Sequence, residues 1–320
     1  MKRQWNAQDA TAPETGGAVE RSSAQANLEV AIKIGTYGEI SIPYPRQVEF
    51  HSRCDYLQSL GRQTRGRPQK GMRVLAPSGS GKTSAAEAYI RLVEARTPST
   101  ATFKPIVLVP LDRATTSKKL FSSILSKFGD GFSDKGSEVV LKQRAITCFQ
   151  RFQSQLLIID EVQHLNYRSS AMNDVTDTLK TLLDAGVLPI VFLGTEEAEG
   201  MFARNLQLNG RLLPPCDFKP LRATSAEDRE LLAGYWERLE DEIVERKLLP
   251  TPSRLSQPWV LGALHKVSSG VIGRISRLTE TALEIAIRRG AERLEIYDLA
   301  QATDRWAIDQ NFTAYNPFRQ

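Results

Sequence analysis

A segment rich in glycine and serine separates a short apolar run from a helical pattern near residue 80. It reads Ala76-Pro-Ser-Gly-Ser-Gly-Lys-Thr83, follows the apolar run 72–75 and precedes the stretch 84–93, which is predicted to be a helix. A strand, a glycine-rich loop ending in Gly-Lys-Thr and a helix, in this order, place backbone N–H groups around an anion at the helix N-terminus. The order restricts this part of the chain to α/β folds in which a parallel strand leads into a helix.

The composition of this loop suits polyphosphate binding. Lys82 is expected to reach the β- and γ-phosphates of a nucleotide, and the Thr83 hydroxyl is expected to hold Mg²⁺. Ala76 stands where such loops usually begin with glycine, and alanine fits there if its φ is negative. The alternative is a turn that contains Lys-Thr by chance. We predict a site for ATP and Mg²⁺. The predicted phosphate-binding residues are Pro77, Ser78, Gly79, Ser80, Gly81, Lys82, Thr83 and Ser84.

Apolar runs alternate with helical patterns through the first two thirds of the chain. Four further strands are predicted at 106–109, 156–159, 188–193 and 216–218, which with the first strand make a five-stranded, doubly wound parallel sheet sandwiched by helices. After Pro220 only helical patterns follow. The segments predicted are a flexible arm at 1–45 with a β-like piece at 28–34, an αβα domain at 46–220, a helical lid at 221–306 and a tail at 307–320.

Polar residues follow two of the predicted strands. Asp160 and Glu161 come directly after the run 156–159, at the strand end where parallel sheets bind ligands. Asp160 is expected to orient Mg²⁺, and Glu161 to polarise the attacking water. Thr195 ends the next strand and is expected to position that water, or to cap the following helix. The alternative for the two acids is a strand end with solvated carboxylates.

The amino-acid composition argues against several other classes of protein and site. The three cysteines are scattered and odd in number, which argues against a disulfide framework and fits a reducing compartment. The three histidines show no metal-ligand spacing, so a zinc site is not expected. No apolar run approaches the ~20 residues of a membrane span, and the N-terminus lacks the apolar core of a secretory signal. The net charge of +5 suits a polyanionic partner only weakly.

Taken together, these motifs resemble those of AAA+ ATPases and, more narrowly, of the TniB family of transposition ATPases. The resemblance covers about residues 45–300, and its narrower part lies in the segment 179–213. It implies ATP-dependent rings or helical filaments of the chain on duplex DNA, without sequence preference. It also implies a transposase and a target-selection adaptor as partners, and a cytoplasmic, nucleoid-associated protein in bacteria.

The resemblance also assigns roles to arginines. Arg211 matches the arginine finger that completes a neighbouring subunit's site, with Arg204 as the second candidate. Arg274 matches the lid arginine that contacts nucleotide, with Arg277 one turn on. The alternatives are salt-bridge arginines for the first pair and a solvated helix face for the second.

Basic residues after the second predicted strand are candidates for DNA contact. Arg113, Lys118 and Lys119 lie among hydroxyl side chains, a mixture typical of phosphate contacts. Lys142 and Arg144 are secondary candidates. The basic loop 62–70 is a candidate for contact with DNA, with nucleotide or with a neighbouring subunit. For each of these, an exposed solvated side chain is the alternative.

These observations lead to one functional hypothesis and two rivals. The chain is expected to be an ATPase that assembles on target DNA with ATP, recruits and activates a transposase, and disassembles on hydrolysis. A helicase loader or replication initiator of the same fold is the alternative, and a signalling NTPase is the third option. The terminal segment 311–320, with Phe312, Tyr315 and Phe318, is either a docking strip or a frayed end.

Overall fold

The computed structural model describes residues 15–165 and 175–319, which fall into two compact units. The unit that contains the sheet comprises residues 41–235 and 264–275, and is called the sheet unit below. The other comprises residues 1–40, 236–263 and 276–320, and is called the helical unit. The domain limits predicted at residues 45, 220 and 306 remain predictions.

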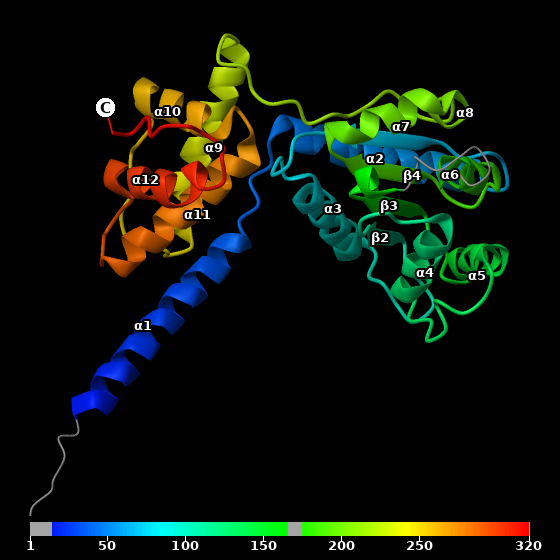
Figure 1. The fold of residues 1–320 in the computed structure, drawn as a ribbon, viewed down its shortest axis with the longest axis horizontal. Coiled ribbons are helices and arrows are strands. Elements are labelled where there is room, and N and C mark those ends of the chain that lie inside the picture. Colours follow the sequence, from blue (N-terminus) through cyan, green and yellow to red (C-terminus); the bar gives the residue numbers. More distant parts are fainter. Residues whose placement is uncertain (1–14, 166–174, 320) are drawn as a thin grey trace, which may run out of the picture. The chain divides into compact units, whose positions relative to one another are not determined.

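The sheet unit is built on a parallel sheet, four-stranded in the described residues, with the order β1-β4-β3-β2 (Figure 1). The strands are β1 (Gly71–Leu75), β2 (Ile106–Pro110), β3 (Leu156–Asp160) and β4 (Ile190–Gly194). Each of the first three predicted strands forms within a residue or two of its expected position, and the fourth begins two residues later. Because the strands are parallel, their carboxyl ends lie along one edge of the sheet, where Leu75, Asp160 and Gly194 end their strands.

The helices of the sheet unit cover both faces of the sheet. They are α2 (Pro45–Gln63), α3 (Lys82–Arg96), α4 (Ser117–Lys127), α5 (Glu138–Arg151), α6 (Val175–Asp184), α7 (Glu199–Arg204) and α8 (Leu206–Asn209), with single 3₁₀ turns at Val162–His164 and Glu196–Ala198. Side chains from α2 and α3 pack with Leu156 and Ile158 on one face. Those from α4 to α8 pack with Leu157 and Ile159 on the other. All five residues of β3 and of β4 are buried, which explains their continuous apolar sequence.

The predicted fifth strand is wrong. Residues 211–218 run beside β1, and Leu213 N and Cys216 N donate to the carbonyl oxygens of Gly71 and Arg73 at 2.7 and 3.1 Å. Between them, Pro214 and Pro215 have no N–H to donate, so a regular ladder cannot form across this stretch. The segment therefore follows the sheet edge without completing a strand.

The helical unit takes its helices from both ends of the chain. They are α1 (Thr15–Gly38) and parts or all of α9 (Ala226–Glu245), α10 (Pro258–Ser268), α11 (Ile272–Arg288) and α12 (Ile296–Ala302), followed by a π-helical turn at Thr303–Ile308. The β-like expectation for residues 28–34 is wrong, because this stretch lies within α1. The hydroxyl of Tyr37, near the end of α1, donates to the Ser276 carbonyl at 2.8 Å. The separate helical lid stays a prediction.

The C-terminal segment packs onto the helical unit. Phe318 is buried, and the Asn316 amide donates to the Ala300 carbonyl at 2.8 Å. The ring of Phe312 lies 5.1 Å from that of Trp306, between centroids, while Tyr315 is half exposed. The tail is thus ordered by its own contacts as far as Arg319.

Candidate nucleotide-binding site

The predicted phosphate loop joins β1 to α3 as a turn that requires glycine at two positions. Gly79 and Gly81 have φ of +76° and +85°, in the left-handed region that disfavours residues with a Cβ. Ala76 is not among the residues with positive φ, so alanine is tolerated there as expected. Gly81 ends the turn as the N-cap of α3, so the loop closes on a helix N-terminus, which favours an anion.

Lys82, the first residue of α3, is folded into the loop. Its Nζ donates to the carbonyl oxygens of Ala76 and Pro77 at 3.0 and 3.2 Å and to Ser80 Oγ at 3.3 Å. The side chain is only 6% exposed. Burial lowers the pKa of Lys82, while the negative charges of Glu161 and Asp160 act in the opposite direction. A buried ammonium in a loop of this kind is suited to a polyanionic ligand.

Thr83 and Asp160 meet between α3 and β3. The Thr83 hydroxyl donates to Asp160 Oδ2 at 2.6 Å. Burial raises the pKa of Asp160, which is 2% exposed, and the hydrogen bonds from Thr83 and from the Glu161 N–H partly offset that rise. Both residues offer oxygen ligands of the kind that Mg²⁺ prefers. Among residues 15–165 and 175–319 no cluster of three or more His, Cys, Asp or Glu forms a metal cage. The pair therefore fits an ion that takes its remaining ligands from water and phosphate.

Glu161 follows β3 in a conformation that is uncommon for a residue with a side chain. Its φ is +61°, and its N–H donates to Asp160 Oδ1 at 2.8 Å. Its carboxylate Oε2 accepts a short hydrogen bond from Gln163 Nε2. Gln163 is not among the site residues predicted from the sequence. No sequence signal singles it out, because its other partner, Thr195, lies 32 residues further along the chain.

Thr195 lies directly after β4, beside the Asp160–Glu161 pair in the sheet. Its N–H donates to Gln163 Oε1 at 3.0 Å. Its hydroxyl is buried and has no hydrogen-bond partner among the described residues. Thr195 occupies the N-cap position of the following turn, as the alternative predicted, but its side chain makes no capping hydrogen bond there. A buried, unsatisfied hydroxyl at this edge suits contact with a ligand or with water.

The start of α11 lies against the phosphate loop within the sheet unit. A Cβ on Gly273 would lie 2.1 Å from the Gly79 carbonyl oxygen, so only glycine permits this approach. Arg274 follows, and its Cγ is 3.4 Å from the position of a Cβ on Gly79. Burial lowers the pKa of Arg274. Arg277 instead pairs with Glu280 on the helix surface, at 2.6 Å.

The two arginine-finger candidates, Arg204 and Arg211, lie in the segment that leads from the end of β4 to the edge of β1. Arg204 is the last residue of α7 and is exposed. Arg211 Nε donates to Asp184 Oδ1 at 2.7 Å, and the Arg211 carbonyl accepts from Gly71 N at the start of β1. Arg211 therefore lies at the sheet edge opposite the phosphate loop of its own chain and is held by an ion pair.

The basic candidates for DNA contact differ in their surroundings. Arg113 and Lys118 are exposed, and Lys119 is paired with Asp112 at 3.0 Å on the surface. Lys142 donates to Thr181 Oγ1 at 2.9 Å. Arg144 donates to the carbonyls of residues 132 and 135 and forms a short ion pair with Asp130, so its guanidinium is engaged in holding a loop of its own chain.

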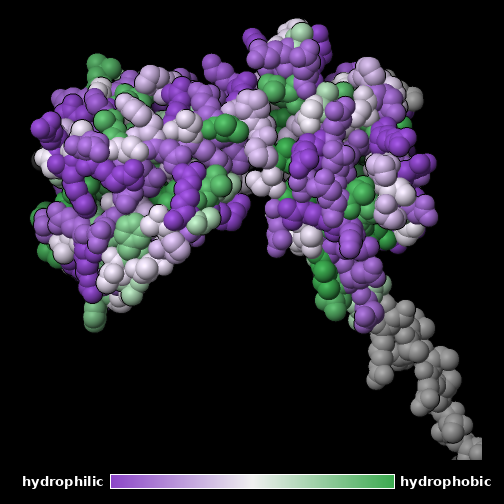
Figure 2. Space-filling view, turned by 180° about the vertical axis from the view of Figure 1, so that it is seen from behind, coloured by the Kyte–Doolittle hydropathy of each residue, from purple (hydrophilic) through white to green (hydrophobic). Residues whose placement is uncertain are grey.

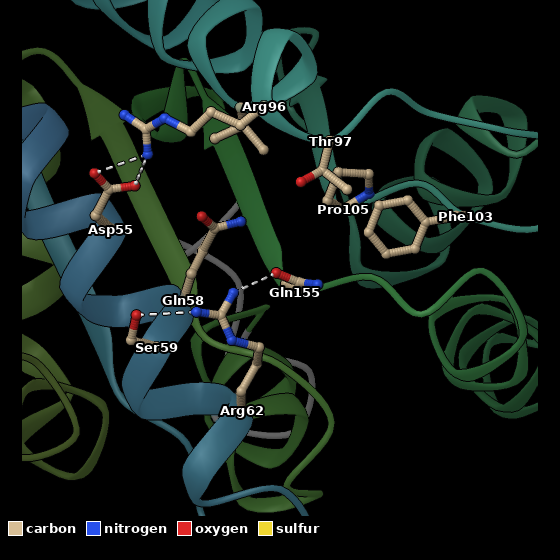
Figure 3. Close-up of a pocket in the computed structure, with 10 residues that line it drawn as sticks. Asp55, Gln58, Ser59, Arg62, Arg96, Thr97, Phe103, Pro105 and Gln155 are labelled. Atoms are coloured by element: carbon tan, nitrogen blue, oxygen red, sulfur yellow. Dashed lines mark hydrogen bonds and ion pairs between the residues drawn. The ribbon is translucent and has the colours of Figure 1, made fainter.

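A pocket of about 330 Å³ lies at the opposite edge of the sheet, where β2 and β3 begin (Figure 3). Arg62 points across it to Gln155 Oε1 at 2.9 Å, and Arg96 pairs with Asp55. The basic loop 62–70 is fixed nearby, since Gly66 N donates to the Gly186 carbonyl at 2.9 Å. The length of β1, about 16 Å, separates this loop from the phosphate loop, so it does not serve the nucleotide site of its own chain.

No helix within the described ranges combines the length and apolar character that a membrane span requires. The face drawn in Figure 2 is mostly hydrophilic, with apolar side chains in small separate groups.

Comparison with known proteins gives one family and one group of similar folds. The family model "Bacterial TniB protein" matches residues 40–216. The Aeropyrum pernix ORC2 protein, solved as ADPNP–ADP complexes, superimposes with a TM-score of 0.61 at 15% identity, covering 84% of this chain and 71% of that one. The Aeropyrum pernix ORC1 protein in complex with DNA gives 0.58 at 18% identity, over 83% and 66%.

A third structure of this fold, CDC6P from Pyrobaculum aerophilum, gives a TM-score of 0.59 at 12% identity, over 85% of this chain and 70% of that one. At these identities the likeness establishes the fold. The sequence matches none of the curated proteins with which it was compared.

Proposed function

The chain belongs to the bacterial TniB family, and we propose that it is an AAA+ ATPase that regulates DNA transposition. In this proposal ATP binding assembles copies of the chain on duplex DNA, the assembly recruits and activates a transposase, and hydrolysis reverses it. The observation that carries the proposal is the convergence of Lys82, Thr83, Asp160, Glu161 and the unsatisfied Thr195 hydroxyl at one edge of the sheet.

Lys82 and the loop N–H groups bind and orient the phosphates. The buried ammonium exchanges its contacts with loop carbonyls for the β- and γ-phosphate oxygens, which are stronger acceptors. Thr83 and Asp160 would hold Mg²⁺ through their side-chain oxygens. When bound, Mg²⁺ neutralises charge that develops on the phosphate oxygens.

Glu161 and Thr195 act on the attacking water. The Glu161 carboxylate accepts a hydrogen bond from the water and orients its oxygen toward the γ-phosphorus. The Thr195 hydroxyl, on the neighbouring strand, fixes the water from a second side. Arg274 approaches the phosphate loop from α11 and supplies positive charge near the phosphates.

A neighbouring copy completes the site with Arg204 or Arg211. A guanidinium from the next subunit stabilises charge on the γ-phosphate, which links nucleotide occupancy to assembly. Within its own chain Arg211 is bound to Asp184, so its use in trans requires that this ion pair opens. Arg204, the exposed last residue of α7, is the second candidate.

Duplex DNA is bound through phosphate contacts from the segment after β2. Arg113, Lys118 and Lys119 lie at the same sheet edge as the phosphate loop, on a loop and helix start that carry exposed cations. Contacts of this kind position a protein without reading base sequence. Lys142 and Arg144 are the weaker candidates, because both already bind groups of their own chain. The expected partners beyond DNA are further copies of the chain, a transposase and a target-selection adaptor.

The experiment that tests this function measures binding of the purified chain to a long duplex by electrophoretic mobility shift. It is run without nucleotide, with ADP and with a non-hydrolysable ATP analogue, each with Mg²⁺. The proposal expects a shift, and particles of many subunits by analytical ultracentrifugation, with the analogue alone. Equal binding in all three conditions, or a monomer with analogue and DNA, contradicts it.

A helicase loader or replication initiator is the second candidate, because ORC and CDC6 proteins are among the solved structures with a similar fold. Both candidates use the same nucleotide site. Purification of a tagged chain from cells separates them, since the first retains a transposase and the second a replicative helicase. A signalling NTPase, the third option, hydrolyses nucleotide at a rate that does not respond to DNA.

A further inference from the structure

One amide side chain joins the two residues proposed to act on the attacking water. Gln163 lies in the 3₁₀ turn after β3, two residues beyond Glu161. Its Nε2 donates to Glu161 Oε2, and its Oε1 accepts the Thr195 N–H at 3.0 Å. We propose that Gln163 is a positioning residue that holds the Glu161 carboxylate at a fixed orientation relative to the end of β4.

The need for such support follows from the backbone at Glu161. A residue other than glycine with φ near +61° lies in a sparsely populated region, so local backbone preference does not fix the direction of this side chain. The Glu161 N–H is tied to Asp160 Oδ1, which anchors the main chain alone. The contact from Gln163 acts on the carboxylate itself and supplies the missing restraint.

The end of β4 is shaped to receive this amide. A Cβ on Gly194 would lie 2.9 Å from Gln163 Oε1 and 2.7 Å from Val162 Cγ2. Glycine at this position therefore leaves the space that the turn after β3 occupies. Only a side chain with both a donor and an acceptor can bridge a carboxylate and a backbone N–H, and glutamine has the two on one planar group.

The hydrogen bond from Gln163 gives the two oxygens of the Glu161 carboxylate different roles. Gln163 engages Oε2, and we assign Oε1 to the water that attacks the γ-phosphorus. In that step the bond from water oxygen to phosphorus forms and the β,γ-bridging P–O bond breaks. The displaced oxygen leaves with ADP, and the water proton moves toward Oε1. Because Gln163 donates to the Glu161 carboxylate and only accepts from the Thr195 backbone N–H, the proposal expects it to act on the rate mainly through Glu161.

This inference rests on the proposed role of Glu161, and the test is a double-mutant cycle on that pair. Gln163→Leu keeps the size of the side chain and removes both hydrogen bonds. ATP turnover at saturating Mg²⁺-ATP is measured for the wild type, Gln163→Leu, Glu161→Gln and the double variant. Binding of a fluorescent ATP analogue is measured in parallel.

Gln163→Leu alone is expected to lower kcat about tenfold, with analogue affinity changed by less than about twofold. In the Glu161→Gln background the same substitution is expected to change the residual turnover by less than about twofold, because the group through which it acts is gone. An equal fold-loss in both backgrounds overturns the inference, as does a Gln163→Leu variant with wild-type kcat.

Two controls separate positioning from a general structural effect. Gln150→Leu makes the same change on the exposed face of α5 and is expected to keep wild-type kcat and melting temperature. Gln163→Glu keeps an acceptor for the Thr195 N–H but offers Glu161 no donor, and is expected to lose activity as Gln163→Leu does. Retained activity in Gln163→Glu overturns the inference.

Different results would contradict the proposed function, the role of Glu161 and the role of Gln163. A wild-type chain without ATP turnover contradicts the proposed function as a whole. Glu161→Gln with wild-type turnover contradicts the role of Glu161 and, with it, that of Gln163. Independent, multiplicative losses contradict the role of Gln163 alone.

Discussion

Two charged residues of the candidate site lie in surroundings that disfavour their charged forms. Asp160 and Lys82 are both almost fully buried, and burial moves their pKa values in opposite directions, up for the carboxyl group and down for the ammonium. Neither shift favours the charged form that phosphate and Mg²⁺ binding needs. The loop carbonyls and the Thr83 hydroxyl provide partial compensation. A site of this kind lowers the stability of the free protein and regains it on binding.

Asp160→Asn is predicted to stabilise the free protein. Because the pKa of Asp160 is higher in the folded state than in the unfolded chain, its contribution to stability is present at low pH and is lost as the pH rises above about 4. Asparagine keeps the shape without the charge. The melting temperature at pH 7, without nucleotide or Mg²⁺, is expected to rise by about 2 °C, while Mg²⁺-dependent turnover is lost. Asp134→Asn, at an exposed position, serves as the control, and a lower melting temperature for Asp160→Asn contradicts the prediction.

Gly273→Ala is predicted to weaken nucleotide binding. Its Cβ would lie 2.1 Å from the Gly79 carbonyl oxygen, so either α11 or the phosphate loop must move. The affinity for a fluorescent ATP analogue is expected to fall about tenfold, equivalent to ~1.4 kcal/mol. Gly262→Ala is the matched control, since a Cβ there meets no atom within 4 Å. Equal affinities of the two variants would show that the close approach has no part in binding.

At the scale of elements, the segments that follow β2 and β3 are joined. Thr115 N donates to the His164 carbonyl at 2.9 Å, and His164 Nδ1 lies 3.0 Å from the Leu111 carbonyl oxygen. The loop that carries Arg113 is therefore hydrogen bonded to the turn that follows Glu161. This arrangement brings the proposed DNA-contacting segment and the proposed hydrolytic residues onto neighbouring strand ends of the sheet unit.

The double variant Arg113→Ala, Lys118→Ala is predicted to weaken DNA binding equally for all duplex sequences. Both side chains are exposed, so their removal leaves the core intact. If each neutralises one phosphate, the slope of log affinity against log salt falls by about 2. Titrations at several salt concentrations measure this slope, with Lys127→Ala, also exposed and near the other end of α4, as the control. An unchanged slope contradicts the assignment of these two residues.

Arg144→Ala is predicted to loosen a loop more than it weakens DNA binding. The Arg144 guanidinium binds Asp130 and two loop carbonyls, and its removal leaves these acceptors unsatisfied. Amide hydrogen exchange in residues 130–136 is expected to become faster, with a loss of about 1–3 kcal/mol in the free energy of unfolding. Unchanged exchange together with a large loss of DNA affinity would restore Arg144 as a direct contact.

At the scale of the whole molecule, the proposed function depends on more than one copy of the chain. Arg211 is not directed at the phosphate loop of its own chain, because it lies at the start of β1, at the opposite edge of the sheet. A site that needs an arginine from a neighbour is complete only in an assembly. Nucleotide occupancy and oligomer size are then linked by mass action.

Glu161→Gln is predicted to trap the assembled state. The substitution keeps the phosphate loop and the Thr83–Asp160 pair, so ATP still binds, but the water is no longer polarised. With Mg²⁺-ATP and duplex DNA, the variant is expected to stay in large particles for hours by analytical ultracentrifugation while the wild type disassembles. Lys82→Ala provides the opposite case and is expected to remain small in every condition. Particles of Glu161→Gln that dissociate as fast as those of the wild type contradict the proposal.

The sequence was sufficient wherever a feature is encoded by neighbouring residues. The phosphate loop, the run 156–159 with its two acids, and the helices around them carry local patterns of glycine, β-branched residues and periodicity, and they form within a residue or two of their predicted positions. The local pattern was wrong for residues 28–34, where both helical and strand periods fit. It was also wrong for the strand predicted at 216–218, because Pro214 and Pro215, directly before it, have no N–H to donate beside β1.

What only the tertiary structure decided is which distant groups meet. The bridge from Glu161 through Gln163 to Thr195, the contact of Gly273 with Gly79 and the ion pair of Arg211 with Asp184 join residues far apart in the chain. The bridge depends on the parallel order β1-β4-β3-β2, which places the end of β4 beside that of β3. The sequence by itself determined the kind of chemistry, because local residue types fix it. The partners of each group were decided by the sheet, because strand order sets which ends are neighbours.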